Sequence, residues 1–315
     1  MKYALEHSTD LIAAICRRVR GVGPSKGYAL AEYLDNDWVA FLKADTTKIS
    51  NLEKSSGKQL FTSEQIKELI KIKNEFLDLT NVRSAWIYFI GKDFLLSQIE
   101  MLRSITLSNL DINPFLMKVL NFKTPKDILE FNLYQTVTRS IVTSWGSTVE
   151  ELLARCGAEK FTEKTKGDRA GRRPDIKKMF GNKKFYIQVK SGPNTMNVDM
   201  VNSLNEVILN YQKREPSAVF LLGMTYGTKE RISSQIRANL SNFENSILIG
   251  RHLWDFVSEE KNFHREIFKI LDISSREIAT KTFSDHLKDQ LIALVDEWTE
   301  FYGKTSVDMA YEKFI

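Results

Sequence analysis

The chain has 315 residues, of which 43% are hydrophobic, so it can build a sizeable core and hold two domains. Its net charge of +5 is too small to identify a partner. No segment approaches the roughly 18 apolar residues of a membrane span, and the N-terminus lacks the apolar stretch of a signal peptide, so we expect a cytosolic protein. Two distant cysteines and four scattered histidines indicate neither a disulfide framework nor a zinc site.

Residues 1–143 are predicted to form a mostly helical region. Thr9–Arg20 has apolar residues at helical spacing, and the Gly-Pro-containing segment Gly21–Pro24 separates it from a second predicted helix, Tyr28–Leu34. This arrangement resembles the helix-hairpin-helix motif, in which backbone amides at a glycine turn meet a phosphate. Gly27 would be the small residue on the second helix. An ordinary helix pair joined by a Gly-Pro turn is the alternative.

Two more amphipathic helices are predicted downstream, over Ser63–Leu77 and Lys92–Ser104. Pro114 and Pro125 mark breaks between later helices. No internal repeat or low-complexity segment interrupts this region, so we treat it as one helical unit.

A second domain, residues 144–275, is predicted to begin where the composition changes near Trp145. Its first element is a helix that starts at Gly146 and continues to Cys156. Gly157 is a suitable residue to end this helix, because glycine readily adopts the left-handed conformation found there.

Positive charge is concentrated in residues 160–190. This stretch has eleven Lys or Arg and three Asp or Glu, a local excess of +8 that leaves −3 for the rest of the chain. Such focusing attracts a polyanion, and phosphate contacts dominate affinity for nucleic acid. A solvated lysine-rich loop is the alternative.

A β-hairpin is predicted within the basic stretch. Residues 185–190 alternate as a strand does, so Gln188 and Lys190 share one face while the apolar residues between them face a core. A Gly-Asn turn at 181–182 folds the preceding residues back and brings the carboxylate of Asp175 towards that face. A carboxylate, an oxygen donor and a lysine can hold a hard divalent cation and activate a water. A plain hairpin with a solvated polar face is the alternative.

This stretch resembles the catalytic hairpin of the PD-(D/E)XK nuclease superfamily. Pro174-Asp175 corresponds to the PD, and Gln188-Val189-Lys190 corresponds to the last half-motif. The twelve residues between Asp175 and Gln188 lie within the usual range of that family. Gln188 departs from the pattern, because most members have Glu or Asp there. A Gln still offers a carbonyl oxygen to a metal, with one negative charge fewer, and some active restriction enzymes of the superfamily carry Gln near this place.

The resemblance implies a Mg²⁺-dependent active site. Asp175 and Glu150 would bind the metal, with the carbonyl oxygen of Val189 and the amide of Gln188 assisting. Lys190 would orient or help deprotonate the attacking water and stabilise the charge that develops on the phosphorane.

Glu150 is included because the first core helix of the superfamily often supplies a glutamate, commonly four residues after a glycine, and Gly146 precedes Glu150 at this spacing. Glu151 lies about 100° further round the helix. The alternative is that Glu150 is an ordinary exposed acid of that helix.

The rest of the domain alternates between helix and strand. The predicted elements are a helix capped by Asn197, a buried strand, a basic helix and a short strand: Val198–Arg214, Ala218–Tyr226, Lys229–Leu240 and Ser246–Gly250. This order predicts an α/β fold with a central mixed sheet flanked by helices, which is also the order of the restriction-endonuclease-like core. The tail, residues 276–315, is predicted to contain one long amphipathic helix, Arg276–Gly303.

Within the superfamily, the chain resembles type II restriction endonucleases over roughly residues 110–260. The resemblance rests on three segments: NPFL at 113–116, SWGSTVEELL at 144–153 and QVKSGPNTMN at 188–197. It implies a homodimer that cuts both strands of a short palindrome in double-stranded DNA. It also implies a cognate DNA methyltransferase that protects the host, in a prokaryotic cytoplasm.

Reading a sequence would need Arg or Lys against guanine edges in the major groove. The side chains predicted to contact DNA are basic or amide residues around the hairpin and the following strands: Arg172, Arg173, Lys177, Asn194, Asn197, Lys229, Arg231 and Arg237. A phosphate contact or a solvated charge is the simpler explanation for each basic one. Two other classes stay open. One is a junction or repair nuclease with the same core, and the other is a non-catalytic DNA-binding protein, for which Gln188 is the main support.

Overall fold

The computed structural model of the protein describes residues 2–53, 57–162, 173–278 and 281–303. Its N-terminal part is mostly helical, as predicted. The helices are α1 (Lys2–Cys16), α2 (Pro24–Tyr33), α3 (Trp38–Lys43), α4 (Thr46–Ser50), α5 (Ser63–Asn74) and α6 (Val82–Arg103). The last of these begins ten residues before its predicted start.

Helices α1 and α2 pack closely at Gly27. A Cβ atom added to Gly27 would lie 2.6 Å from Cα of Ala13, so no larger residue fits this approach of the two helices. Gly21 in the connecting turn has φ +73°, and Pro24 occupies the first turn of α2, where a missing N–H does no harm. The predicted helix pair is confirmed, and its use as a phosphate-binding motif stays a prediction.

Gly27→Ala should lower the stability of the protein, although alanine is the better helix former. The gain in helix propensity is about 1 kcal/mol. Overpacking of a tight contact costs roughly 1–3 kcal/mol, and here the clash is with backbone that cannot swing away. Urea or thermal unfolding measures the change. A variant at least as stable as the wild type would show that α1 and α2 do not approach this closely.

The second half of the chain carries a five-stranded sheet in the order β1-β2-β3-β4-β5. The strands are β1 (Glu159–Lys160), β2 (Ile176–Phe180), β3 (Lys183–Lys190), β4 (Val219–Met224) and β5 (Ile247–Ile249). The first three are antiparallel neighbours, and β3, β4 and β5 run parallel. This mixed sheet confirms the α/β fold class. Because β3, β4 and β5 point the same way, their carboxyl ends lie at one edge of the sheet, which we call the carboxyl edge.

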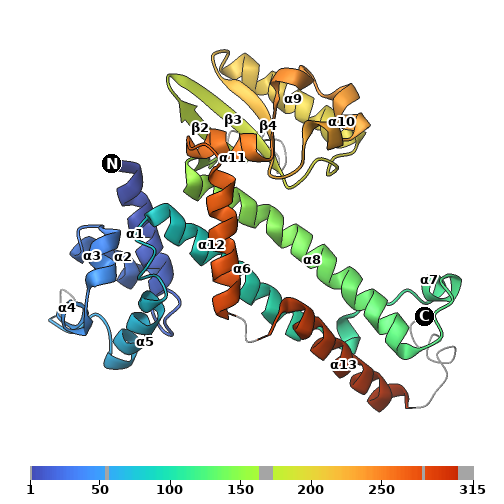
Figure 1. Cartoon of the computed structure of the whole chain (residues 1–315), viewed down its shortest axis with the longest axis horizontal. Helices are drawn as coiled ribbons and strands as arrows, with labels where there is room; N and C mark the ends of the chain where they lie inside the picture. Colours follow the sequence, from blue (N-terminus) through green and yellow to red (C-terminus); the bar gives the residue numbers. More distant parts are fainter. Residues whose placement is uncertain (1, 54–56, 163–172, 279–280, 304–315) are drawn as a thin grey trace.

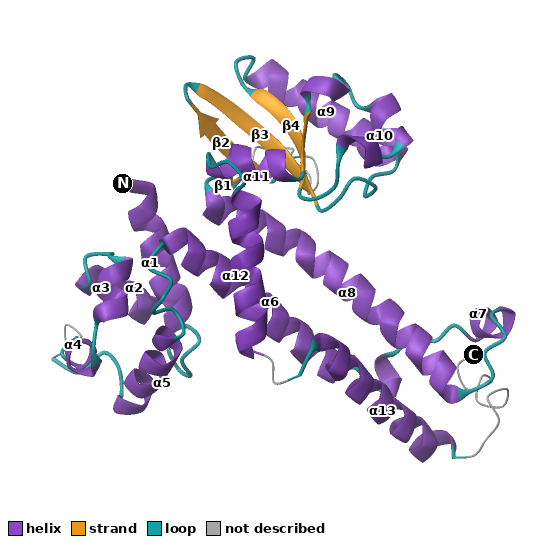
Figure 2. Cartoon of the chain, viewed as in Figure 1, coloured by secondary structure: helices purple, strands orange, loops and turns teal. Residues whose placement is uncertain are grey.

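Helices cover both faces of the sheet (Figure 2). They are α8 (Pro125–Cys156) and α11 (Arg251–Ser258) on one face, and α9 (Val198–Arg214) and α10 (Ser234–Asn239) on the other. Ile187 and Val189 of β3 lie in the first layer, as predicted. The opposite face is not solvated, because Tyr186 packs under α9 and Gln188 is only 8% exposed.

One hydrophobic core joins the N-terminal helices to the sheet. Leu11 of α1, Leu152 of α8 and Ile187 of β3 belong to the same cluster of buried side chains. Both cysteines, Cys16 and Cys156, lie completely buried in this cluster. Burial raises the pKa of each thiol to about 12.

Helix α8 is longer than predicted. The sequence pattern placed a helix start at Gly146, whereas α8 is a single helix of 32 residues that begins after the cap residue Thr124 and crosses the expected boundary at 143–144. The polar residues before Gly146 are compatible with helix because their hydroxyls bond back to the preceding turn. Thr143 Oγ1 donates to the carbonyl of Arg139 (2.8 Å), for example.

Two other predicted helices are divided in the structure. The helix predicted over Arg276–Gly303 is interrupted: its first three residues end α12 (Phe263–Ile278), and a new helix, α13 (Phe283–Tyr302), begins where Thr282 and Asp285 build a capping box. The predicted basic helix after β4 becomes a short 3₁₀ turn, η2 (Lys229–Arg231), followed by α10, whose first turn is capped by Ser233.

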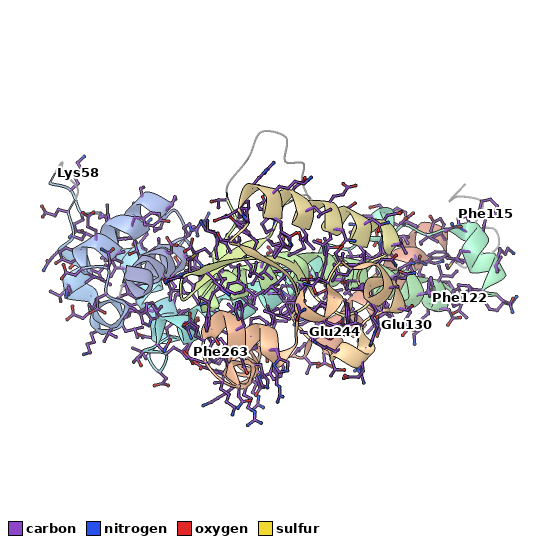
Figure 3. The ribbon with its side chains drawn as sticks, turned by 90° about the horizontal axis from the view of Figure 1, so that it is seen from above. Lys58, Phe115, Phe122, Glu130, Glu244 and Phe263 are labelled. Carbon is purple, nitrogen blue, oxygen red and sulfur yellow. The ribbon has the colours of Figure 1, made fainter. Side chains whose placement is uncertain are left out.

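The long half of α8 forms an arm with α13. Leu129 and Leu133 of α8 and Trp298 of α13 share a separate core that also receives Leu102 of α6. The arm ends at α7 (Pro114–Val119) and the turn η1 (Leu107–Asn109); a third short turn, η3 (Phe243–Asn245), precedes β5. Figure 1 shows the arm leading away from the sheet, and Figure 3 shows Phe115 at its tip with Lys58 at the opposite end of the molecule. None of the described helices is long and apolar enough to span a membrane.

Candidate active site at the carboxyl edge of the sheet

The predicted hairpin is formed by β2 and β3. Ile176 pairs with Ile187, and the Asp175 N–H donates to the carbonyl of Ile187 (3.0 Å), so Asp175 lies opposite Gln188 just before β2. Gly181 in the turn has φ +57°, a conformation that glycine adopts at no steric cost. The hairpin therefore brings Asp175 to the end of β3, as the sequence predicts.

The carboxylate of Asp175 is held by two donors. Its Oδ2 accepts a hydrogen bond from Gln188 Nε2 (2.5 Å) and another from the Val189 N–H (2.6 Å). A carboxylate only accepts, so the NH₂ end of the Gln188 amide must face it. These two bonds fix the orientation of the Asp175 side chain.

Burial raises the pKa of Asp175 to about 6. The hydrogen bond from Val189 opposes this shift, the negative charge of Glu150 adds to it, and Lys190 and Arg173 oppose it. Asp175 on the hairpin and Glu150 on α8 are thus close enough to repel each other, with the two cations beside them. Lys190 is half-buried at the last position of β3.

The two adjacent glutamates of α8 have different surroundings. Burial raises the pKa of Glu150, and the nearby charges of Lys160, Lys190 and Arg173 oppose that shift. Burial would also raise the pKa of Glu151, but hydrogen bonds from Lys160 and Arg155 outweigh it and hold that pKa below its usual value.

Glu151 is tied into ion pairs with Arg155 (Nε to Oε1, 2.7 Å) and Lys160 (Nζ to Oε2, 2.5 Å). Arg155 also lies over the ring of Trp86 and reaches Asp10 of α1 (2.8 Å). Glu150 is therefore the glutamate that shares a site with Asp175, and Glu151 belongs to the scaffold. Lys160 was not among the predicted site residues, although it begins the basic stretch of the sequence.

The donor set fits a hard divalent cation. Two half-buried carboxylates that repel each other are relieved by a cation, and Mg²⁺ prefers oxygen ligands and usually keeps several waters. Among the described residues, no group of three or more His, Cys, Asp and Glu could hold a metal. Within the described ranges, the further oxygens predicted for this site are neutral, the amide of Gln188 and the carbonyl of Val189.

A family model described as type II restriction endonuclease EcoO109I matches residues 87–279, more than half of the chain. The chain belongs to this family. The matched segment runs from α6 to the end of α12 and contains the whole sheet with Glu150, Asp175, Gln188 and Lys190. Restriction endonucleases are nucleases that hydrolyse DNA. The match extends beyond the predicted 110–260 at both ends. A search of curated proteins finds no match.

The residues predicted to contact DNA have different surroundings, and one of them, Arg173, lies near the two carboxylates of the candidate site. Asn194 is exposed in the loop that follows β3. Lys177 forms an ion pair with Glu159 across the β1–β2 pair (3.3 Å). Arg172 lies outside the described residues.

Others have structural partners. Asn197 caps α9 by accepting from the Met200 N–H (2.9 Å). Arg237 donates to the carbonyls of Ile232 and Lys229 (3.0 and 2.5 Å), and thereby holds the η2–α10 connection. Lys229 and Arg231 are exposed beyond the end of β4. These local bonds favour a scaffolding role for Asn197 and Arg237 and leave the DNA contacts of the other residues as predictions.

Gln188→Glu should make the metal-free protein less stable and its response to metal larger. The new carboxylate would replace a donor to Asp175 with a third negative charge in the site, so the melting temperature without metal falls. Mg²⁺ or Ca²⁺ should then raise the melting temperature more than in the wild type, because tighter binding to the folded state adds stability. Scanning fluorimetry with and without metal measures both effects.

We also expect the Gln188→Glu enzyme to remain active, at lower Mg²⁺ concentrations than the wild type. Gln188→Ala is the control, since it removes the donor without adding charge. A folded, DNA-binding but inactive Gln188→Glu variant would show that Gln188 contacts the phosphate or the attacking water instead of the metal.

Proposed function

We propose that the protein is a Mg²⁺-dependent type II site-specific deoxyribonuclease, which hydrolyses phosphodiester bonds of double-stranded DNA at a short palindromic site. The observation that supports this is the arrangement of Glu150 and Asp175 beside Lys190 at the carboxyl edge, in a chain that belongs to a restriction endonuclease family. Lys190 opposes the raised pKa of both carboxylates, and this shared effect supports assigning the three groups to one centre.

In this mechanism Asp175 and Glu150 would hold the cation, and the Gln188 amide and the Val189 carbonyl would offer further oxygens. When bound, Mg²⁺ polarises the scissile phosphate and lowers the pKa of a bound water. The Val189 N–H keeps Asp175 oriented throughout. The ammonium of Lys190 orients the attacking water and stabilises the negative charge that develops on the phosphate oxygens.

The proposal includes partners. Two identical active sites suit a palindrome, so the working form is a homodimer on duplex DNA with one site per strand. Survival of the host requires a cognate DNA methyltransferase that modifies the same sequence. Such a pair works in the cytoplasm of a prokaryote.

A digest of phage DNA in Mg²⁺, followed by sequencing of the fragment ends, tests the proposal. Discrete bands whose ends share one short palindrome are the expected result. Cleavage that follows DNA structure instead of sequence would favour the junction or repair nuclease. Stable DNA binding without any cleavage would favour the non-catalytic DNA-binding protein.

Lys190→Ala should reduce cleavage by at least about 100-fold while DNA binding in Ca²⁺ is retained, because one transition-state group is lost and most positive charge remains. The matched control is Lys184→Ala, which removes the same charge from the other end of β3, where Lys184 pairs with Glu215 (2.7 Å). Single-turnover cleavage of a labelled duplex measures the rates. A Lys190→Ala rate within tenfold of the wild type would remove Lys190 from catalysis.

Asp175→Ala should abolish cleavage, and Glu150→Ala should strongly weaken the use of Mg²⁺. Glu151→Ala is the control: it should leave the Mg²⁺ dependence nearly unchanged and reduce stability by about 1 kcal/mol or less, because its ion pairs are partly solvated. Cleavage rates over a Mg²⁺ titration separate these outcomes. If the two glutamates exchanged behaviour, the rotation of α8 at the site would be wrong.

A further inference from the structure

Gly146 lies in the interior of α8, and no contact among the described residues requires a glycine at this position. Glycine destabilises a helix relative to alanine. Gly146 has no positive φ, and apart from its chain neighbours and the adjacent backbone of α8, no described atom lies within 4 Å of a Cβ built on it. The contrast is Gly27, where the backbone of α1 excludes a side chain. Among the described residues, nothing therefore fills the space beside Gly146.

Gly146 lies on the side of α8 that carries Glu150. Residues three or four apart share a helix face, so Glu150, Gly146, Thr143 and Arg139 form one line along α8, which we call the Glu150 face. Thr143 and Arg139 are exposed. At 1.5 Å per residue the line is roughly 16 Å long, about five base-pair steps of 3.4 Å. It begins at the active site and runs outward along the arm.

The charge of this part of α8 suits a polyanion. Residues 131–149 contain no Asp or Glu, and Arg139 is their one charged residue. Along α8, the next acid towards the tip is Glu130, which Figure 3 shows on that side of the molecule. Hydroxyl and guanidinium groups are typical partners of phosphate oxygens, and the missing carboxylates remove repulsion. A helix surface that contacts only water is expected to carry acidic residues over this length.

We propose that the Glu150 face of α8 binds the DNA strand that is cut, and that Gly146 lets the sugar–phosphate backbone approach the helix one turn from the active site. This inference rests on the proposed nuclease function and deepens it. Arg139 and Thr143 contact phosphates further along the same strand. The alternative is that a second copy of the chain binds to this face. In that case the same substitutions would change the oligomeric state instead of DNA binding.

The test uses Gly146→Ala and Gly146→Gln in the full-length protein. Both residues are better helix formers than glycine, so each variant should melt about 1–3 °C above the wild type. Cleavage and DNA binding in Ca²⁺ should nevertheless fall, by at least about tenfold for alanine and further for glutamine. Gly27→Ala is the matched control for the sign of the stability change, because the same substitution there lowers the melting temperature. The DNA probe is a labelled duplex that contains the site mapped by the phage digest.

Gly146 variants that bind and cut DNA within twofold of the wild type would overturn the proposal, as would a change of oligomeric state with unchanged binding. A wild-type protein that binds duplex DNA but never cuts it would reject the nuclease function. In that case the probe is a random-sequence duplex, and only DNA binding is measured. Weaker binding by the Gly146 variants would support the Glu150 face as a DNA-binding surface, and equal binding would overturn it.

Salt dependence gives a second readout. Arg139→Gln should lower the slope of log affinity against log salt by about one, since one phosphate contact is lost. Arg276→Gln removes the same charge from an exposed position on α12, where Arg276 pairs with Asp272 (2.8 Å), and should leave the slope unchanged. Equal slopes for wild type and Arg139→Gln would show that Arg139 does not contact the DNA.

Discussion

The C-terminal end of α8 packs its apolar side against one face of the sheet, and the geometry of the site depends on this contact. Val149 and Leu152 lie in the same core as Ile187 of β3. Because burial of these residues fixes the rotation of the helix, Glu150 is turned towards Asp175 while Glu151 is turned into ion pairs with Arg155 and Lys160. The same core continues into α1 and α6, so the carboxylates of the site stand on a rigid support.

Gln188 serves the site in two ways: it limits the negative charge beside Asp175 and it orients the Asp175 carboxylate. The metal-free site already holds two carboxylates whose pKa values are raised, and a third would add repulsion in a half-buried place. A neutral amide avoids that repulsion and also donates the hydrogen bond that orients Asp175. Under the proposed function, Glu150, Asp175 and the neutral Gln188 would hold Mg²⁺ with one negative charge fewer than a site with a third carboxylate.

The sequence predicted the elements whose signals are local. The Gly-Asn turn and the alternation in β3 identified the hairpin, and Asn197 identified the start of α9. It failed where the outcome depends on distant partners. Arg155 is held by Asp10, 145 positions away, and Tyr186 is covered by α9, so neither the ion-pair role of Glu151 nor the burial of the second face of β3 is visible in a local pattern. The continuity of α8 was missed because the composition changes near Trp145 and a new helix start was placed at Gly146, although the hydroxyls before Gly146 bond within the helix.

The two buried thiols make the protein convenient for fluorescence and spin labelling. Cys16 and Cys156 are inaccessible and remain protonated at neutral pH, so maleimide reagents have no native target in the folded protein. If one cysteine is introduced at an exposed position on the arm and one on α9, only these two would react, and the native cysteines need not be removed. The distance between such labels could then be followed while DNA is added.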